Sequence, residues 1–305
     1  MSTNENTANE KQDVYQRVTD SIISAIERGV GNWQMPWNTS GRFAFSPINI
    51  TSRNPYRGIN TLCLWAAAQA KGYDRAEWGT YQQWQERKGQ VRKGEKATTV
   101  VFWKFANDST ESQDDGGEQA VTSRSRLLFT RGYAVFNADQ VDGYTPKAEP
   151  EIPAFERMEQ AEAFFRNIGA NVRHGGNQAY YSPNSDYIQM PPFRAFTDAL
   201  SYYSTSAHEH THWTAKTDRC DRQLGKRFGD NAYAAEELIA ELGAAFTCAH
   251  LGLSTEPRAD HAAYINSWLN VLKADKRAIF TAASKSQQAA DYLVQRSERI
   301  AEVAA

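Results

Sequence analysis

The sequence predicts an α+β fold with two domains, an N-terminal domain that mixes helices with strands and a mostly helical C-terminal domain with a small sheet. Two properties of the chain indicate two cores: it has 305 residues, and 41% of them are hydrophobic. A third observation places the boundary, because residues 142–153 contain three prolines and several acidic side chains. We therefore expect one domain at residues 1–145, which should fold alone, a linker at 146–153 and a second domain at 154–305.

The N-terminal domain is expected to contain three helices followed by a pair of strands. In the first helix, valine and isoleucine side chains recur every four residues from position 14 to position 26, which gives the helix one apolar face. The third helix begins at Thr80, whose hydroxyl suits an N-cap, and a glycine follows each of the three helices. A polar, acidic excursion at residues 107–125 separates the two strands. In chain order, these elements are expected at residues 11–28, 61–71, 80–88, 98–105 and 126–137.

The C-terminal domain is expected to begin with a helix, continue with two short strands around a turn, and end with helices. Its most strongly patterned helix covers residues 195–213, because apolar side chains recur there at helical spacing and neither proline nor glycine interrupts it. In chain order, the elements are expected at residues 154–166, 180–190, 195–213, 233–246 and 257–302.

A metal-binding motif lies at the end of the helix at residues 195–213. Residues 207–213 read Ala-His-Glu-His-Thr-His-Trp and contain the pattern His-Glu-x-x-His, with His208 and His212 four residues apart. On a helix this spacing places both imidazoles on one face, where they can bind a single ion. Glu209 can then accept a proton from the water that a Zn²⁺ ion activates. The motif predicts a zinc hydrolase, most readily a metallopeptidase, with Glu209 as the catalytic base.

A catalytic zinc site needs a third protein ligand, and the helix at residues 233–246 offers three glutamates. Glu237 and Glu241 are four residues apart and share a face, which suits a ligand and a carboxylate that orients a zinc-bound histidine. Glu236 is the alternative third ligand. Between the two motif histidines, His210 points to another side of the helix and is expected to be structural. The remaining histidines, which follow no ligand spacing, are His174, His250 and His261.

Charge is distributed unevenly along the chain, although the formal net charge is only −2. Residues 42–104 contain eleven Lys or Arg against four Asp or Glu, a net charge of +7, and ten aromatic residues are interleaved with them. Cations bind phosphates and rings stack on unpaired bases, so this mixture indicates binding of single-stranded DNA without sequence specificity. Aromatic residues in loops are expected to stack on bases, and these are Trp33, Trp37 and Tyr56. Basic residues in turns are expected to contact phosphates, and these are Arg53, Arg57, Arg92, Lys93 and Lys96.

The sequence also indicates the compartment in which the protein works. No run of 18 apolar residues occurs, and the first residues are polar without an apolar signal segment, so we expect neither a membrane span nor secretion. The three cysteines are scattered and odd in number, which is typical of reduced thiols. These features predict a cytoplasmic protein.

The metal motif and the helix after it resemble the glutamate-type zincins, in which His-Glu-x-x-His is followed by a helix with Glu-x-x-Ala-Glu. In those enzymes the first of these two glutamates is the third zinc ligand, which corresponds to Glu237. The residue four positions later, Glu241, then corresponds to the carboxylate that orients a zinc-bound histidine. The donor that stabilises the transition state is left open among three tyrosines, which are Tyr202, Tyr203 and Tyr233.

Five short blocks of the N-terminal half resemble the single-stranded-DNA-binding domain of plasmid antirestriction proteins of the ArdC family, a module also found at the front of some plasmid primases. These blocks are residues 24–29, 33–37, 56–60, 78–84 and 91–96, in that order. ArdC-like proteins carry a zincin domain with the same metal motif behind this module, so the resemblance covers nearly the whole chain. It implies a cytoplasmic protein that protects incoming plasmid DNA from host restriction during conjugation.

Two functional hypotheses follow from these observations. In the first, DNA binding brings a zinc protease to a host protein, which the protease cuts. In the second, the chain is a non-enzymatic protein that masks single-stranded DNA, and its metal site is structural or inactive. An intact Glu209 favours the first hypothesis, because a structural site has no need of a base. Neither the protein substrate nor the oligomeric state is predicted.

Overall fold

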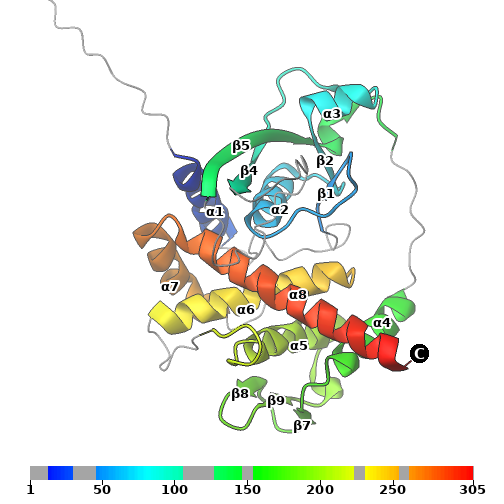
Figure 1. Cartoon of the computed structure of the whole chain (residues 1–305), viewed down its shortest axis with the longest axis vertical. Coiled ribbons are helices and arrows are strands. Elements are labelled where there is room, and N and C mark those ends of the chain that lie inside the picture. The colour runs from blue at the N-terminus through cyan, green and yellow to red at the C-terminus, as the bar shows by residue number, and fades with distance from the viewer. Residues whose placement is uncertain are drawn as a thin grey trace, which may run out of the picture.

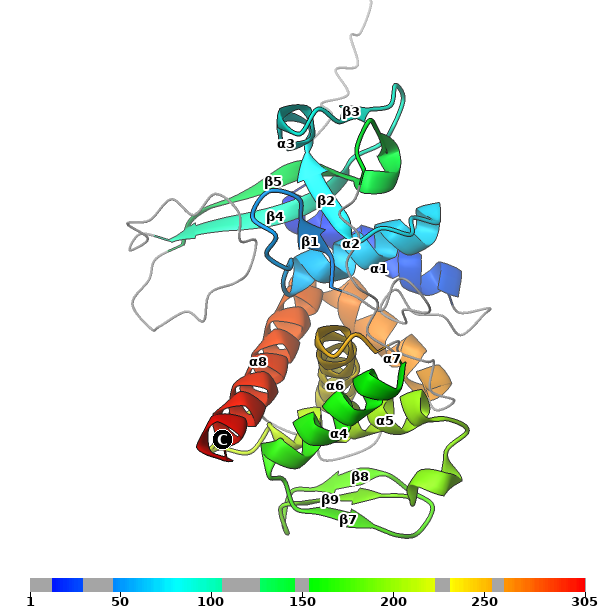
Figure 2. The same cartoon turned by 90° about the vertical axis from the view of Figure 1, so that its right-hand side faces the viewer.

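The structure is a computed structural model that describes residues 13–29, 46–105, 127–145, 154–222, 231–253 and 261–304. Within these residues, the N-terminal part forms a sheet flanked by helices, and the C-terminal part forms a helical bundle with a small sheet at its far end (Figure 1). Seen from the side, helix α8 (Ala278–Ala304) runs from the N-terminal part along the whole bundle (Figure 2). The two parts are therefore stacked along the long axis of the molecule.

The N-terminal part contains helices α1 (Val14–Gly29), α2 (Ile59–Lys71) and α3 (Tyr81–Glu86). Helix α2 ends at Gly72, which adopts the left-handed conformation with a φ of 67° that favours glycine. Helix α3 begins after Thr80, whose hydroxyl accepts a hydrogen bond from the backbone N–H of Gln83, while the Gln83 side chain accepts one from the backbone N–H of Thr80. This capping box fixes the start and the direction of the short helix.

A four-stranded sheet lies against these helices in the order β1-β2-β5-β4. Its strands are β1 (Ile48–Asn49), β2 (Glu77–Thr80), β4 (Thr98–Phe105) and β5 (Leu127–Asn137). The predicted pairing of the two long strands is confirmed, since they run antiparallel from the pair Thr98 and Val135. The sequence does not predict β2, because four residues are too few to show an alternating pattern. Beside α3, two further strands form a separate ladder: β3 (Gln90–Val91) and β6 (Val141–Asp142).

The C-terminal part contains, besides α8, the elements α4 (Ala154–Ile168), β7 (Val172–His174), β8 (Tyr180–Ser182), β9 (Tyr187–Met190), α5 (Ala199–Trp213), α6 (Asn231–His250) and α7 (His261–Ala274). The small sheet has the order β7-β9-β8, so it includes one strand more than the sequence predicts. Helix α5 begins four residues later than expected. Asp198 caps it by accepting a hydrogen bond from the backbone N–H of Ser201 at 2.7 Å, and residues 193–195 form a separate 3-10 turn.

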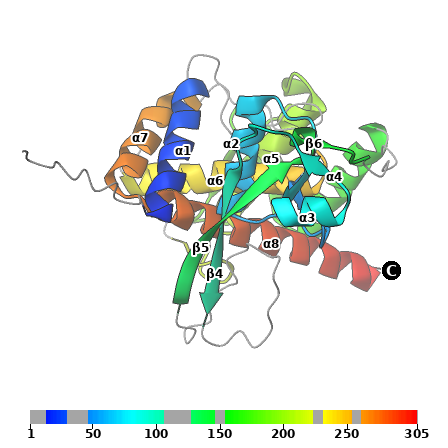
Figure 3. The same cartoon turned by 90° about the horizontal axis from the view of Figure 1, so that it is seen from above.

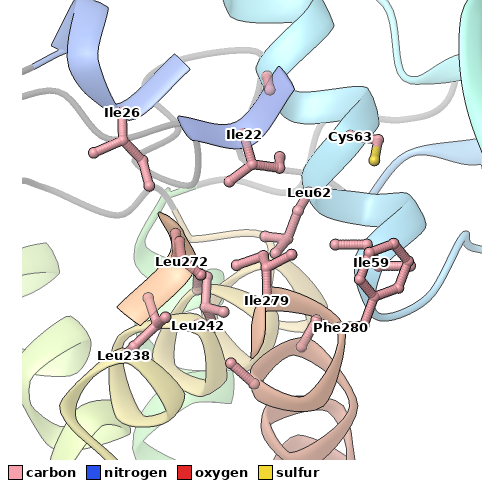
Figure 4. Close-up of a cluster of buried hydrophobic side chains, with 14 of the residues drawn as sticks. Ile22, Ile26, Ile59, Leu62, Cys63, Leu238, Leu242, Leu272, Ile279 and Phe280 are labelled. Atoms are coloured by element: carbon pink, nitrogen blue, oxygen red, sulfur yellow. The ribbon is translucent and has the colours of Figure 1, made fainter. Parts of the chain in front are cut away.

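The largest hydrophobic core crosses the boundary between the two parts (Figure 4). Ile22 of α1 and Leu62 of α2 belong to the same buried cluster as Leu242 of α6, Leu272 of α7 and Ile279 of α8. Helix α1 also lies beside α7 when the molecule is seen from above (Figure 3). The expectation that the N-terminal part buries its apolar faces by itself is therefore wrong in part: α1 and α2 pack against their own sheet and each other, but they also bury side chains against the C-terminal helices.

Helix α6 connects this shared core to the helix that carries the metal motif. One side of α6 packs into the core through Leu238 and Leu242, whereas its glutamates face α5. The two helices approach closely at Gly243, where an added Cβ would lie 2.5 Å from Cγ2 of Thr211. Only glycine permits this approach, because every other side chain would collide with Thr211.

Several predicted features lie outside the described residues, namely Trp33, Trp37, the linker at 146–153 and the excursion at 107–125. The domain limits 1–145 and 154–305 remain predictions. Across the described ranges, no helix combines the length and the apolar character that a membrane crossing requires.

Candidate metal centre

Three side chains from two helices converge on one point. His208 and His212 lie one turn apart on α5, and their Nε2 atoms are 3.1 Å from each other. Glu237 on α6 reaches the same point: its Oε2 lies 3.5 Å from Nε2 of His208, and its Oε1 lies 3.5 Å from Nε2 of His212. One ligand atom from each residue lies within 4.8 Å of the others.

These separations fit a divalent metal ion. Two ligands bound tetrahedrally at roughly 2.0–2.1 Å from zinc lie about 3.3 Å from each other. The observed distances between donor atoms, 3.1 Å and 3.5 Å, bracket that value. Two imidazoles and one carboxylate are also a donor set that leaves a coordination position for water or substrate.

Each motif histidine has a second carboxylate on the other side of its ring. Nδ1 of His208 lies 2.7 Å from Oε1 of Glu241, an ion-pair contact without the alignment of a hydrogen bond. Nδ1 of His212 lies 3.4 Å from Oε1 of Glu236. Glu236 therefore faces away from the point where the Nε2 atoms converge, whereas Glu237 faces it. Both outer carboxylates are placed to hold an imidazole with Nε2 directed inward.

An arginine that the sequence does not single out holds Glu236 in place. The Arg222 side chain is 2% exposed and donates to both carboxylate oxygens of Glu236, at 2.9 Å from Nη2 and 3.2 Å from Nε. Its remaining donors reach the hydroxyl of Thr214 at 2.8 Å and the carbonyl of Thr211 at 2.7 Å. The guanidinium thus joins the outer carboxylate to the end of α5. No sequence signal marks Arg222, because it lies in an irregular segment 14 residues before its partner.

The electrostatics of the site favour positive charge at its centre. Burial alone lowers the pKa of His212, but Glu236 and Glu237 outweigh this effect and raise the pKa to about 10. Burial raises the pKa of Glu237, yet His208 and His212 outweigh this effect and hold the pKa far below its ordinary value. A buried carboxylate that stays ionised between two imidazoles provides a strong attraction for a cation.

Two ionisable residues, Glu209 and His210, lie between the motif histidines. Their surroundings differ. Glu209 is 3% exposed and follows His208 directly on α5. The Nδ1 of His210 donates to the backbone carbonyl of Ser206 at 2.7 Å, and its ring packs against Phe165 at 4.9 Å between centroids. Burial lowers the pKa of His210 to about 4, so its ring is neutral near pH 7. These contacts agree with a structural role for His210.

The three candidate tyrosines occupy different positions. The Tyr203 hydroxyl donates to Glu162 at 3.1 Å, and the Tyr202 hydroxyl lies 2.8 Å from Nε2 of His174. Tyr233 lies on α6 one helical turn before Glu237 and is partly exposed. Residues four apart on a helix share a face, so Tyr233 is on the side of α6 that carries Glu237.

The predicted DNA-contacting residues of the N-terminal part do not form a single surface. Tyr56 is only 7% exposed and packs in a core with Leu64 and Trp78, so its ring presents no face for base stacking and the prediction for Tyr56 is wrong. A loop position in the sequence does not imply exposure, and here the Tyr56 hydroxyl accepts a hydrogen bond from the Asn49 amide at 3.1 Å. Arg57 forms an ion pair with Asp291 of α8, at the junction of the two parts.

The other predicted cations lie on two surfaces. Arg53 lies 3.7 Å from Glu77 in an ion pair whose arginine is exposed and whose glutamate is largely buried. Arg92 pairs with Glu95 at 3.0 Å and with Asp142 at 3.4 Å. Lys93 and Lys96 are exposed and, within the described part of the chain, make no ion pair. These two lysines and Arg92 therefore remain the predicted cations that are placed to meet phosphates.

Comparisons with known proteins identify both halves of the chain. Residues 12–136 match the family model of the N-terminal domain of anti-restriction factor ArdC, and residues 159–285 match a model of zincin-like metallopeptidases. The uncharacterized protein y4eC of Sinorhizobium fredii (strain NBRC 101917 / NGR234) is 50% identical over 292 residues, which cover 95% of this chain and 94% of that protein. A DNA primase TraC of Escherichia coli is 34% identical over 93% of this chain, but the match spans only 27% of the primase.

Solved structures of similar proteins extend this result to the fold. The antirestriction protein ArdC from plasmid R388 is 41% identical, and its metal-free structure superposes with a TM-score of 0.74 over 94% of this chain and 98% of that one. Its Mn(II)-bound structure gives a TM-score of 0.73 over 93% of this chain and 98% of that one. The predicted α+β fold, with a zincin-like C-terminal domain that offers a divalent-metal site, is confirmed. This chain belongs to the ArdC family of antirestriction proteins.

Proposed function

We propose that this chain is an antirestriction protein that binds single-stranded DNA with its N-terminal part and cleaves a host protein with its C-terminal part. In the recipient cytoplasm, this activity protects incoming conjugative plasmid DNA from restriction. The observation that carries the proposal is the convergence of His208, His212 and Glu237 next to Glu209, behind an ArdC-type N-terminal domain.

Support for nucleic-acid binding comes from the N-terminal part. Its ArdC-type domain shares sequence with relatives named DNA primases. Residues 42–104 carry a net charge of +7, and Lys93 and Lys96 project from a basic turn without acidic partners among the described residues. Such cations attract phosphates of any sequence.

In the proposed metal site, His208, His212 and Glu237 are the ligands and Zn²⁺ is the resident ion. The donor separations of 3.1–3.5 Å support a tetrahedral ion such as zinc. Mn²⁺ is the alternative, because a Mn(II)-bound structure exists for the related R388 protein. Metal analysis of the purified protein decides between them: we expect one zinc per chain, and a manganese content in its place would refute the choice of zinc.

The proposed chemistry is hydrolysis of a peptide bond. When bound, the metal acidifies a water molecule and polarises the substrate carbonyl. Glu209 takes the proton from the attacking water and passes it to the leaving amine, which its position beside His208 and its burial support. Glu241 and Glu236 hold the two imidazoles from behind, with Arg222 fixing Glu236.

We also propose Tyr233 as the donor that stabilises the transition state. Tyr233 lies one turn before Glu237 on the same face of α6. Replacement of Tyr233 by Phe should leave metal content unchanged and reduce proteolysis. Tyr202→Phe should leave both metal content and proteolysis unchanged.

The variant Glu209→Gln tests the proposed hydrolysis, because glutamine keeps the shape of the side chain but cannot accept the proton. We expect the variant to bind metal and DNA like the wild type and to lose antirestriction, measured as transfer of unmodified plasmid into restricting and non-restricting recipients. His208→Ala, which removes a ligand, should lose metal as well. If Glu209→Gln retains full antirestriction with metal bound, strand masking protects the DNA and the proteolytic proposal fails.

A further inference from the structure

A concavity lies beside α3 and β3 in the N-terminal part. These two elements are at the end of the molecule opposite the small sheet (Figure 2). The concavity has a volume of about 570 Å³, opens to solvent between α3, β3 and the end of β5, and is lined among others by Tyr81, Gln90, Arg92, Lys93 and Phe136. We propose that this concavity binds a nucleotide of single-stranded nucleic acid, with Tyr81 as the ring on which a base stacks. The inference rests on the proposed single-strand binding and names the site that performs it.

Tyr81 has the exposure that a stacking residue needs and that Tyr56 lacks. It is 44% exposed and is one of four exposed large hydrophobic residues in the described part of the chain. It meets Phe136 edge to face, with ring centroids 6.5 Å apart and planes at 70°. Because the contact is edge to face, Phe136 supports the tyrosine ring without stacking over it.

The ring is also held in a fixed orientation. Tyr81 is the first residue of α3, directly after the capping box at Thr80 and Gln83, so its backbone is constrained. The side-chain Nε2 of Gln90 donates hydrogen bonds to the Tyr81 hydroxyl at 3.1 Å and to the backbone carbonyl of Val91 at 3.0 Å. A ring that is already ordered loses little conformational entropy when a base stacks on it.

The charges at the rim suit a phosphate next to that base. Glu95 and Asp142 also line the concavity and balance Arg92, so Lys93 is the lining cation that is left to meet a phosphate. Lys93 follows Arg92, is exposed, and has no acidic partner within the described residues. An unbalanced ammonium beside an ordered ring provides the two contacts that a nucleotide needs, one to the phosphate and one to the base.

These features favour a single strand over a duplex. In a duplex the faces of the bases are stacked on each other, so a lone tyrosine ring reaches none of them. A duplex reader would place a helix in the major groove, whereas α3 has only six residues and its end is packed against the β3–β6 ladder. The concavity therefore accepts an unpaired nucleotide of any sequence.

Binding of a fluorescent dT20 strand and of a matched duplex, measured by anisotropy at two salt concentrations, tests the proposal. We expect Tyr81→Ala to weaken binding of the single strand about 5- to 150-fold, as expected for one stacking ring, and to leave the salt slope unchanged. Tyr81→Phe, which keeps the ring, should bind like the wild type. Lys93→Gln should lower the salt slope by about 0.7, the change for one phosphate contact on a single strand.

Tyr180→Ala is the matched control, because Tyr180 is 41% exposed but lies on β8 of the C-terminal part. It should bind the strand like the wild type. Tyr81→Leu, which can still pack on Phe136 but has no aromatic face, should match Tyr81→Ala and guards against misfolding of the smaller variant. If the wild type binds no single strand, the proposed function fails; if it binds and Tyr81→Leu binds equally well, this site is wrong while the proposed function stands.

Discussion

Replacement of Glu236 and Glu237 by glutamine, one at a time, distinguishes a metal ligand from a carboxylate that positions one. Glu237 faces the point where the Nε2 atoms of His208 and His212 converge, whereas Glu236 lies against Nδ1 on the far side of the His212 ring. We expect Glu237→Gln to abolish tight metal binding and Glu236→Gln to weaken it only in part.

The size of the partial loss follows from the contacts of Glu236. Its Oε1 lies 3.4 Å from Nδ1 of His212 and 2.9 Å from Nη2 of Arg222, so it fixes the ring without reaching the ion. Loss of such an orienting carboxylate lowers metal affinity about 10- to 100-fold, which corresponds to about 1.4–2.7 kcal/mol. Arg222→Met should fall in the same range, because Glu236 then loses the guanidinium that holds it.

Arg219→Met provides the matched control for this experiment. Arg219 is also a largely buried arginine, with 7% of its side chain exposed, but it pairs with Asp186 at 2.6 Å and lies over the ring of Trp213 at 3.6 Å. Both arginine variants lose a buried charge, and only Arg222→Met should lose metal affinity in competition with a chromophoric chelator. Equal losses in the two arginine variants, or complete loss of metal in Glu236→Gln, would refute the positioning role.

Three further outcomes are expected. Gly243→Ala places a Cβ 2.5 Å from Cγ2 of Thr211, so it should lower both Tm and metal affinity. The additional change Thr211→Ala should restore part of each. If Gly243→Ala changes neither Tm nor metal affinity, α5 and α6 can separate freely. Partial burial raises the pKa of Asp186, but hydrogen bonds from Arg219 and a neighbouring lysine outweigh this and hold it at about 2. Because this folded pKa lies below the unfolded value of 3.8, the stability from Asp186 is present above about pH 4 and is lost as the pH falls toward 2, so urea unfolding at pH 5 and pH 2.5 should show a smaller decline for Asp186→Asn than for the wild type. Leu62→Ala, at a fully buried position of the shared core, should lower the free energy of unfolding by about 2–5 kcal/mol, with coincident fluorescence and circular-dichroism transitions; separate transitions would contradict a shared core.

The sequence predicts the elements that depend on local spacing. His208 and His212 are placed on one face by the helical period alone, and Thr80 and Gly72 mark helix ends through their own backbone chemistry. The choice between Glu236 and Glu237 is different, because adjacent residues on a helix point about 100° apart. Which of them faces the ion depends on how α6 is rotated against α5, and that rotation is set by the close approach at Gly243.

Burial of loop residues is the property that local patterns predict least well. Tyr56 and Tyr81 both belong to sequence blocks typical of the N-terminal module, yet Tyr56 is in a core and Tyr81 is on the surface. The difference arises from strands β2 and β5, which are brought together from distant parts of the chain and cover Tyr56 through Trp78 and Val135. The role of Arg222 cannot be predicted from local patterns for the same reason, because tertiary packing brings its partner Glu236 to it.

The shared core has a consequence for the synthesis of the protein. Helix α1 leaves the ribosome early, but the Thr19 hydroxyl donates to the carbonyl of Lys276, 257 residues later, and Ile22 and Ile26 are buried against helices from the last quarter of the chain. At about 5–20 residues per second, translation of the intervening chain takes on the order of 13–50 s. Until then α1 can pack only against α2 and the strands of the N-terminal part, and the apolar surface that later meets α7 and α8 is a natural target for chaperones. That interval is a lower limit on the delay between the start of translation and the first folded molecule.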